Sequence, residues 1–211
     1  MARRGTIRPL SEKESKRVYN SCLKNLTRRK RQKNSLHYIR ASVEVIVAMF
    51  SGLRVAEISA LMWADISQDT RTDHKEAFYI HVRHGKGGKA RHVQIGIEAR
   101  DILYKWRQLL VRYGYSAEPS DCIFFGFRGR GQKQLTTRRI QQDCERVLDD
   151  NRVSGHSIHD LRHTYATYLY VLSKDVSIVQ NQLGHDDIKT TLRYISVAGK
   201  FINKILNSLY K

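Results

Sequence analysis

The side chains best suited to chemistry gather in the C-terminal half of the chain. The segment 159–164, HDLRHT, begins a predicted helix. Because His159 and Arg162 are three residues apart, both side chains project from one face of its first turn. A helix N-terminus that presents an arginine and a histidine is a natural binding site for a phosphate group.

A second pair of reactive side chains follows. Gly184 is predicted to end a helix and to leave His185 exposed beyond it, and Tyr194 stands nine residues after His185. A tyrosine near the end of an amphipathic helix usually packs in the core. That interpretation is kept for three other tyrosines: Tyr165, Tyr168 and Tyr170.

Upstream, Arg54 follows a predicted helix break, and Glu57 lies three residues later, where it can orient a cation. An isolated Arg–Glu pair is most often a structural ion pair. The turn 85–89, GKGGK, separates two β-prone runs and holds Lys86 at the tip of a predicted hairpin. An isolated turn lysine is by default a solvent-exposed side chain.

Two nucleotide-binding motifs are excluded at this turn. A P-loop requires glycine where Arg83 stands and Ser or Thr where Ala90 follows Lys89. A dinucleotide-binding turn must begin a helix, but here a β-prone stretch follows.

Metal chemistry is not predicted. His81 and His84 are three residues apart, with His74 and His92 nearby, but in a strand that spacing directs the two rings to opposite faces. No cysteine and no second close histidine pair completes a ligand set, so no metal and no cofactor is expected.

The charge balance indicates a polyanionic partner. The 211 residues hold 38 Lys and Arg against 20 Asp and Glu, a net charge of +18. Double-stranded DNA is favoured over an anionic membrane, because no apolar run approaches a bilayer span and no signal peptide is visible. A dense basic run is either a solvated loop or, as we favour, a phosphate-contacting patch: Arg28, Arg29, Lys30, Arg31 and Lys33.

The elements predict a mainly α fold with a small antiparallel sheet (α+β). Residues 1–10 read as a basic flexible lead-in, and Ser11 with Glu14 as a capping box. Strands are predicted over 77–83 and 91–95, and a short extended piece over 121–125. Helices are predicted from the capping box onward and over 38–50, 55–62, 97–113, 136–150, 160–172, 175–183, 186–193 and 198–210. Three cysteines without a CxxC pair indicate reduced thiols in a cytosolic protein: Cys22, Cys122 and Cys144. The expected localisation is cytoplasmic and nucleoid-associated.

Together the arginines, histidines, lysine and tyrosine supply phosphate clamps, proton donors and a nucleophile. That is the equipment for metal-free phosphoryl transfer through a covalent phosphotyrosine. Four stretches in this order resemble the tyrosine recombinase/integrase family over roughly residues 10–200: SGLRVAEISALMWADI, HGKGGKARHVQI, HDLRHTYAT and LGHDDIKTTLRY. The resemblance implies the catalytic-domain fold of that family over 11–211.

The resemblance also implies individual roles. Arg54 and Arg162 would bind the scissile phosphate, and Tyr194 would attack it and hold the 3′-phosphate. Lys86 would be the general acid, with Lys89 a poorer match. His159 would assist proton transfer and His185 would hydrogen-bond the phosphate. Glu57 would support the site, and Lys89 and Arg91 join the basic run as expected DNA contacts.

One departure from the family pattern concerns the N-terminus. Most members carry a helical DNA-binding domain before the catalytic domain, but Arg54 comes too early to leave room for it. Both a complete short member and a catalytic fragment fit this pattern.

The expected function is site-specific DNA strand cleavage and rejoining, in integration, excision or inversion. The alternative is a non-catalytic DNA-binding accessory of another recombinase, against which the complete set of catalytic residues argues. The expected partners are double-stranded DNA, other protomers in a dimer or tetramer on DNA, and a partner recombinase or a DNA-bending protein. The apolar stripe of 198–210 either closes the core of this protein or, as we favour, docks on a neighbouring protomer.

Overall fold

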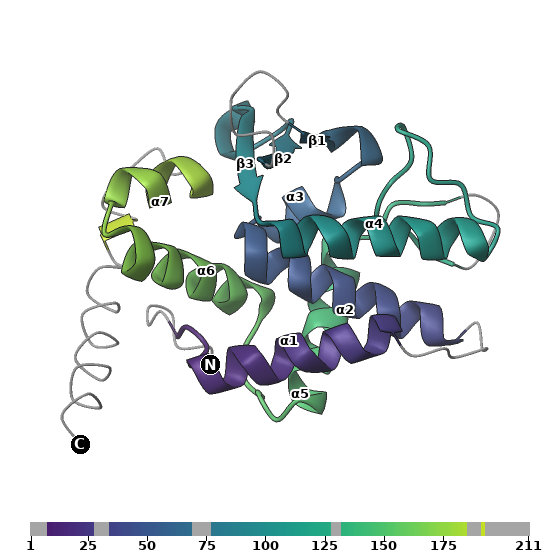
Figure 1. Cartoon of the computed structure of the whole chain (residues 1–211), viewed down its shortest axis with the longest axis horizontal. Coiled ribbons are helices and arrows are strands. Elements are labelled where there is room, and N and C mark those ends of the chain that lie inside the picture. The colour runs from purple at the N-terminus through teal and green to yellow at the C-terminus, as the bar shows by residue number, and fades with distance from the viewer. Residues whose placement is uncertain (1–7, 28–33, 69–76, 128–131, 185–190, 193–211) are drawn as a thin grey trace.

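The computed structural model describes residues 8–27, 34–68, 77–127, 132–184 and 191–192. Its elements confirm the predicted mainly α fold with a small antiparallel sheet (Figure 1). The helices are α1 (Glu12–Thr27), α2 (Asn34–Ser51), α3 (Val55–Ser59), α4 (Ile97–Arg112), α5 (Thr137–Asp150), α6 (Ile158–Ser173) and α7 (Val176–Leu183). The strands are β1 (Ile66–Gln68), β2 (Phe78–Val82) and β3 (Arg91–Ile95), and two 3-10 turns are η1 (Trp63–Asp65) and η2 (Lys86–Gly88).

Helix α2 is the centre of the fold. It packs against α1, α4, α5 and α6, and in Figure 1 it lies between α1 and α4. A helix with neighbours on so many sides must be apolar around most of its circumference. All eight residues of the run 41–48, ASVEVIVA, are buried, and all but Ser42 and Glu44 are apolar.

One guanidinium inside this core ties three segments together. Arg40 of α2 is 1 % exposed; its Nε donates to Glu44 at 2.9 Å and its Nη2 to Asp143 of α5 at 2.6 Å. Its Nη1 donates to the backbone carbonyl of Phe125 at 2.9 Å. Burial raises the pKa of Glu44 to about 8, although the charge of Arg40 opposes that shift. The carboxylate of Asp143 is therefore the better placed of the two to balance Arg40.

The sheet confirms the predicted hairpin and adds a strand. Strands β2 and β3 pair antiparallel across the turn that contains η2, and β1 pairs with the other edge of β2. The short β1 was not predicted, because three residues are too few for a periodic pattern. The inner face of β2 is buried, whereas His81 points outward and stacks on its cross-strand partner His92 at 4.7 Å between ring centroids. Among the described residues no group of three or more potential ligands surrounds a metal position.

Two predicted boundaries need correction. The helix predicted over 55–62 ends at Ser59, because the Asp65 carboxylate accepts a hydrogen bond from the backbone N–H of Met62 and begins η1. Met62 instead forms an isolated bridge with Cys122, inside the predicted extended piece. Leu10, which the prediction placed in the lead-in, is fully buried, and its N–H donates to Thr164 of α6 at 2.8 Å.

Several predicted segments lie outside the described residues. They are the N-terminal part of the lead-in, the basic run at 28–33, most of the helix predicted over 186–193, and the helix predicted over 198–210. Within the described part of the chain, no helix combines the length and the apolar character needed to cross a membrane.

The Arg40 network makes a stability prediction. Asp143→Asn should lower the free energy of unfolding by about 3–5 kcal/mol, because it leaves the buried charge of Arg40 without its better counter-ion. Urea denaturation followed by circular dichroism measures this. Glu145→Gln, on the exposed face of the same helix, is the control. Equal stabilities for the two variants would contradict the assignment.

Candidate active site

The first part of the site is built where α2 ends and α3 begins. Gly52 ends α2 with a left-handed φ of +61°, and a side chain there would collide with the Tyr165 ring. Two residues later, the N–H of Arg54 donates to the Glu57 carboxylate at 2.7 Å. A glutamate at the third position of a helix satisfies the N-cap N–H in this way, which explains the three-residue spacing.

Glu57 is a shared counter-ion. It is 6 % exposed, and Arg54 Nη1 donates to its Oε1 at 2.9 Å. Arg91 of β3 donates to both of its oxygens, Nη1 to Oε1 at 2.8 Å and Nη2 to Oε2 at 2.9 Å. Burial raises the pKa of Glu57, but the hydrogen bonds from Arg91 and Arg54 outweigh burial and leave that pKa below its usual value. Glu57 is therefore ionised at neutral pH.

Arg162 joins the ends of two other helices. It is the fifth residue of α6, which Asp160 caps by accepting from the N–H of Ser157 at 2.9 Å. Its Nη1 donates to the carbonyl of Gly52 at 2.5 Å and its Nη2 to that of Leu183 at 2.8 Å. Arg162 is 4 % exposed, so these bonds fix its position.

The pKa of His159 is shifted by burial and by neighbouring charges. Partial burial lowers the pKa of His159, and the positive charges of Arg162 and Arg54 lower it further, against the opposing charge of Asp160. Arg162 follows His159 by three residues in α6, so the two side chains leave the helix on the same face. His159 is neutral at neutral pH, and its exposed ring can accept a proton at one nitrogen and donate at the other.

The end of α7 completes the described site. Gly184 adopts φ +61° and ends the helix, which confirms the predicted cap. Its carbonyl accepts from Arg54 Nη2 at 3.4 Å, and a Cβ on Gly184 would lie 2.7 Å from Arg91 Cδ. Arg54, Arg162 and Arg91 thus all reach the last residues before His185, whose own placement lies outside the described residues.

The hairpin turn brings the predicted general acid toward this region. Lys86 begins η2, and the turn is closed by the N–H of Gly85, which donates to the carbonyl of Lys89 at 3.0 Å. Lys89 is exposed, whereas the side chain of Lys86 lies outside the described part of the chain. The same holds for Tyr194 and for the predicted DNA contacts in the basic run: Arg28, Arg29, Lys30, Arg31 and Lys33.

Arg91 has a position that the sequence did not predict. The sequence offered it as a DNA contact, but both of its terminal nitrogens bind Glu57 and its side chain is only 12 % exposed. No local pattern links two residues 34 positions apart on a strand and a helix. DNA contact by Arg91 stays a prediction, and its ion pair is a second role.

Comparison with known proteins identifies the chain. Residues 9–200 match the model of the phage integrase family. The chain belongs to the phage integrase family. The tyrosine recombinase XerC of Corynebacterium glutamicum is 30% identical over 177 residues, which cover 84% of this chain and 53% of that protein. The tyrosine recombinase XerD of Ralstonia nicotianae is 35% identical over 164 residues, covering 75% and 48%.

Solved structures of site-specific recombinases share the fold. A post-cleavage complex of the XerH site-specific recombinase with a palindromic difH substrate superposes with a TM-score of 0.73 at 21% identity. It covers 98% of this chain and 54% of that one. The pre-cleavage complex of XerH with difH gives 0.69 at 25% identity over 89% of this chain and 49% of the other. The chain spans about half the length of the relatives it matches.

The histidine beside the site predicts an acid-sensitive stability. Burial, and then the nearby His159, lower the pKa of His163 from 6.5 to about 4. The folded state thus binds fewer protons here than the unfolded chain. Above about pH 6.5 the histidine is neutral in both states and does not lower the free energy of unfolding. As the pH falls toward 4, the unfolded chain takes up a proton that the folded protein does not, and the free energy of unfolding decreases. His163→Gln should flatten the fall in melting temperature over that range. His84→Gln, at an exposed histidine, should keep the wild-type slope, and an equally steep slope in both variants would refute the prediction.

Proposed function

We propose that this chain is the catalytic domain of a site-specific DNA recombinase that cleaves and rejoins strands through a 3′-phosphotyrosine on Tyr194. The observation that carries the proposal is that Arg54 and Arg162 both bind carbonyl groups at the end of α7, while His159 stands three residues before Arg162 in α6. Membership of the phage integrase family supports it. The placement of two guanidinium groups beside a neutral imidazole suits a phosphodiester that gains negative charge during reaction.

The reaction consists of two transesterifications. The Tyr194 oxygen attacks the scissile phosphorus and loses its proton, with neutral His159 as the proposed acceptor. The bond from phosphorus to the 5′-oxygen breaks, and Lys86 supplies the proton that this oxygen takes. In the second step a 5′-hydroxyl attacks the phosphotyrosine and gives its proton to Lys86. The bond from phosphorus to the Tyr194 oxygen breaks, and His159 returns a proton to Tyr194. The ester bond is conserved, so no nucleotide is consumed.

The arginines supply the positive charge in this scheme. Arg54 and Arg162 contact the nonbridging oxygens, Glu57 orients Arg54, and His185 donates a hydrogen bond to the phosphate. Because guanidinium and ammonium groups carry the charge, we expect no divalent metal and no cofactor.

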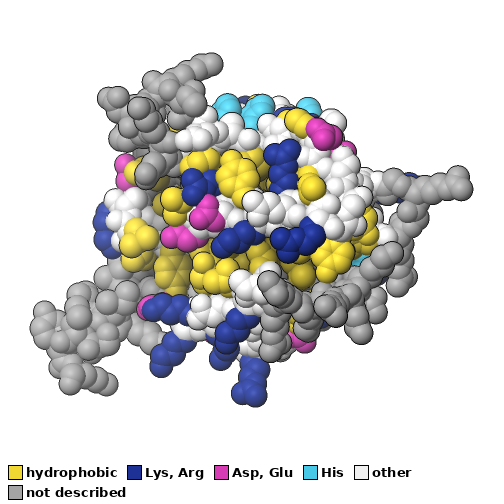
Figure 2. Space-filling view, turned by 45° about the vertical axis from the view of Figure 1, so that its right-hand side comes forward, with side chains coloured by type: hydrophobic (Ala, Val, Ile, Leu, Met, Phe, Trp, Pro, Cys, Tyr) yellow, Lys and Arg dark blue, Asp and Glu magenta, His cyan; other side chains and the backbone are white. Residues whose placement is uncertain are grey.

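Double-stranded DNA is the proposed substrate. The net charge of +18 supports this, and Figure 2 shows lysine and arginine side chains spread across one face of the molecule. The basic run at 28–33 and Lys89 are the proposed backbone contacts. The proposed setting is the cytoplasm, on the nucleoid, where the reaction is integration, excision or inversion with a partner recombinase or a DNA-bending protein.

The nucleophile is tested directly. Tyr194→Phe should bind a nicked duplex as the wild type does but form no SDS-stable protein–DNA adduct, because phenylalanine lacks the attacking oxygen. Gel electrophoresis after denaturation measures the adduct. Tyr104→Phe, an exposed tyrosine on α4, is the control and should form it normally. A normal adduct in Tyr194→Phe would move the nucleophile elsewhere, and DNA binding without an adduct in the wild type would indicate a non-catalytic accessory.

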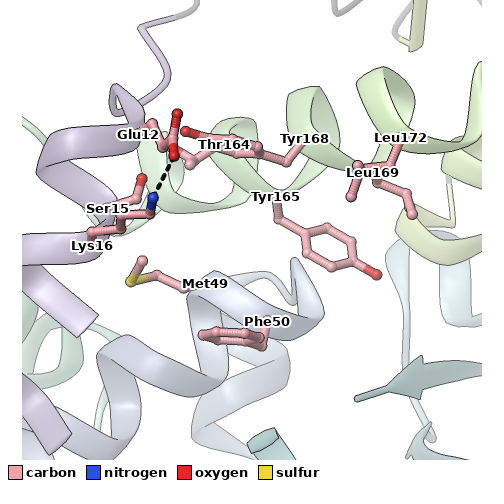
Figure 3. A pocket seen from close by; sticks show the side chains of 10 residues that line it. All are labelled: Glu12, Ser15, Lys16, Met49, Phe50, Thr164, Tyr165, Tyr168, Leu169 and Leu172. Atoms are coloured by element: carbon pink, nitrogen blue, oxygen red, sulfur yellow. Dashed lines mark hydrogen bonds and ion pairs between the residues drawn. The ribbon is translucent and has the colours of Figure 1, made fainter. Parts of the chain in front are cut away.

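We propose further that residues 198–210 dock on a second copy of this chain assembled on DNA. A pocket of about 370 Å³ between α1, α2 and α6 offers an apolar acceptor (Figure 3). Met49 and Phe50 form its floor, Leu169 and Leu172 line its α6 side, and Leu172 is 81% exposed. The stripe of 198–210 has matching apolar residues: Phe201, Ile202, Ile205, Leu206 and Leu209.

The docking proposal predicts a loss of cooperativity. Leu172→Glu should keep folding and single-site binding but weaken cooperative binding to paired sites, because a carboxylate at the rim opposes burial of the apolar stripe. Deletion of 198–211 should do the same. Val111→Glu, which also replaces an exposed apolar residue by glutamate but lies on α4, is the control. Gel-shift titration on one-site and two-site DNA measures the effect, and unchanged cooperativity in Leu172→Glu would exclude this pocket.

A further inference from the structure

The guanidinium of Arg91 lies where three parts of the candidate site meet. It binds Glu57, which in turn holds Arg54. It also lies against two glycine backbones that lead directly into predicted catalytic residues. Its Nη1 is 3.2 Å from the position that a Cβ on Gly85 would take, and Gly85 precedes Lys86. Its Cδ and Nε are 2.7 and 2.9 Å from the corresponding point on Gly184, which precedes His185.

These close approaches leave Arg91 little freedom. A side chain on Gly184 would overlap the Arg91 side chain, and one on Gly85 would crowd its guanidinium. Arg91 Nε also donates to the carbonyl of Gln182 near the end of α7, at 3.3 Å. The side chain therefore bridges β3, α3 and the end of α7, and a shift of any of these segments disturbs its bonds.

The two arginines share the oxygens of the Glu57 carboxylate unequally. Arg91 binds both carboxylate oxygens as a fork, whereas the side chain of Arg54 donates to Oε1 through Nη1. Arg91 thus prevents Arg54 from taking the whole carboxylate in a bidentate pair. It also supplies a second positive charge, so that the group of Arg54, Glu57 and Arg91 carries a net positive charge toward a phosphate.

We infer that Arg91 is a positioning residue of the strand-cleavage reaction: through Glu57 it fixes the guanidinium of Arg54. This inference rests on the proposed function. It separates Arg91 from the predicted DNA contacts, because a positioning residue acts on the rate of cleavage and a DNA contact acts on affinity and on its salt dependence.

The first test is single-turnover cleavage of a nicked duplex. Arg91→Met should cleave about 10²-fold more slowly at saturating protein, with an unchanged half-saturating concentration, because a catalytic group displaced by a fraction of an ångström loses most of its effect. Arg91→Lys should recover only part of the rate, since an ammonium keeps the charge but not the fork. A raised half-saturating concentration with a normal rate would overturn the inference in favour of a DNA contact.

A matched control lies on the same hairpin. Arg83 pairs with the buried Asp65 at 3.0 Å and donates to the carbonyl of Ala60, and neither of these partners belongs to the candidate site. Arg83→Met removes a comparable ion pair and should cleave at the wild-type rate. An equal loss of rate in Arg83→Met would show that the hairpin's stability is responsible, and would overturn the inference.

A double variant tests the route through Glu57. If Arg91 acts through this carboxylate, Arg91→Met combined with Glu57→Gln should cleave no more slowly than Glu57→Gln alone. The double variant also removes the buried carboxylate that Arg91→Met leaves half-paired, so it remains informative if the single variant is unstable. If the rate loss of the double variant equals the product of the losses in the two single variants, the inference is overturned.

A measurement without DNA separates this inference from the proposed function. The side-chain Nε–H signal of Arg54, identified in NMR spectra by its loss in Arg54→Lys, should shift in Arg91→Met and not in Arg83→Met. A shift with no cleavage by the wild type would sustain the positioning role and refute the recombinase proposal. An unmoved Arg54 signal in Arg91→Met would refute the positioning role even if the wild type cleaves DNA.

Discussion

The buried carboxylate of Glu57 is the interaction on which the rest of the site depends. It satisfies the backbone N–H of Arg54, which begins α3, and it accepts from the guanidinium groups of Arg54 and Arg91. One side chain therefore fixes a helix start, a candidate phosphate ligand and the edge of the hairpin. A carboxylate at 6 % exposure is tolerated because its hydrogen bonds replace the lost water.

Around this carboxylate the arginines use the free carbonyl groups at helix ends. The last carbonyls of a helix have no partner within it, and Arg162 and Arg54 bind those of Leu183 and Gly184 at the end of α7. Arg162 also binds the carbonyl of Gly52, just beyond α2. Left-handed glycines at both places let the chain turn away so that the carbonyls remain accessible. The residues that end the helices therefore also supply the carbonyl groups that position the arginines.

The core supplies the rigidity that this arrangement needs. Helix α2 is buried on most sides, and its Arg40 binds Asp143 of α5 and the backbone carbonyl of Phe125. Because α2 is held in place, the positions of Gly52 and Arg54, which follow its last residue, are also fixed. The buried thiols of Cys22 and Cys144 are part of this packing, and burial raises the pKa of Cys22 to about 12 and also raises that of Cys144.

The sequence by itself determined the elements and the candidate residues. Helix periodicity, the Ser11–Glu14 capping box and the glycine turn predicted α1, α2, α4 to α7 and the hairpin, because each of these signals is local. The order of the motifs indicated the family, because residue types and spacing carry that information.

Only the tertiary structure decided how these residues are paired. The fork of Arg91 on Glu57, the bonds of Arg162 to Gly52 and Leu183, and the buried Arg40 network join residues far apart in the chain. The sequence marks Arg91 only as one more basic residue in a very basic protein. A guanidinium becomes a DNA contact or an internal brace according to which carboxylate the fold places beside it, and no local pattern records that distance.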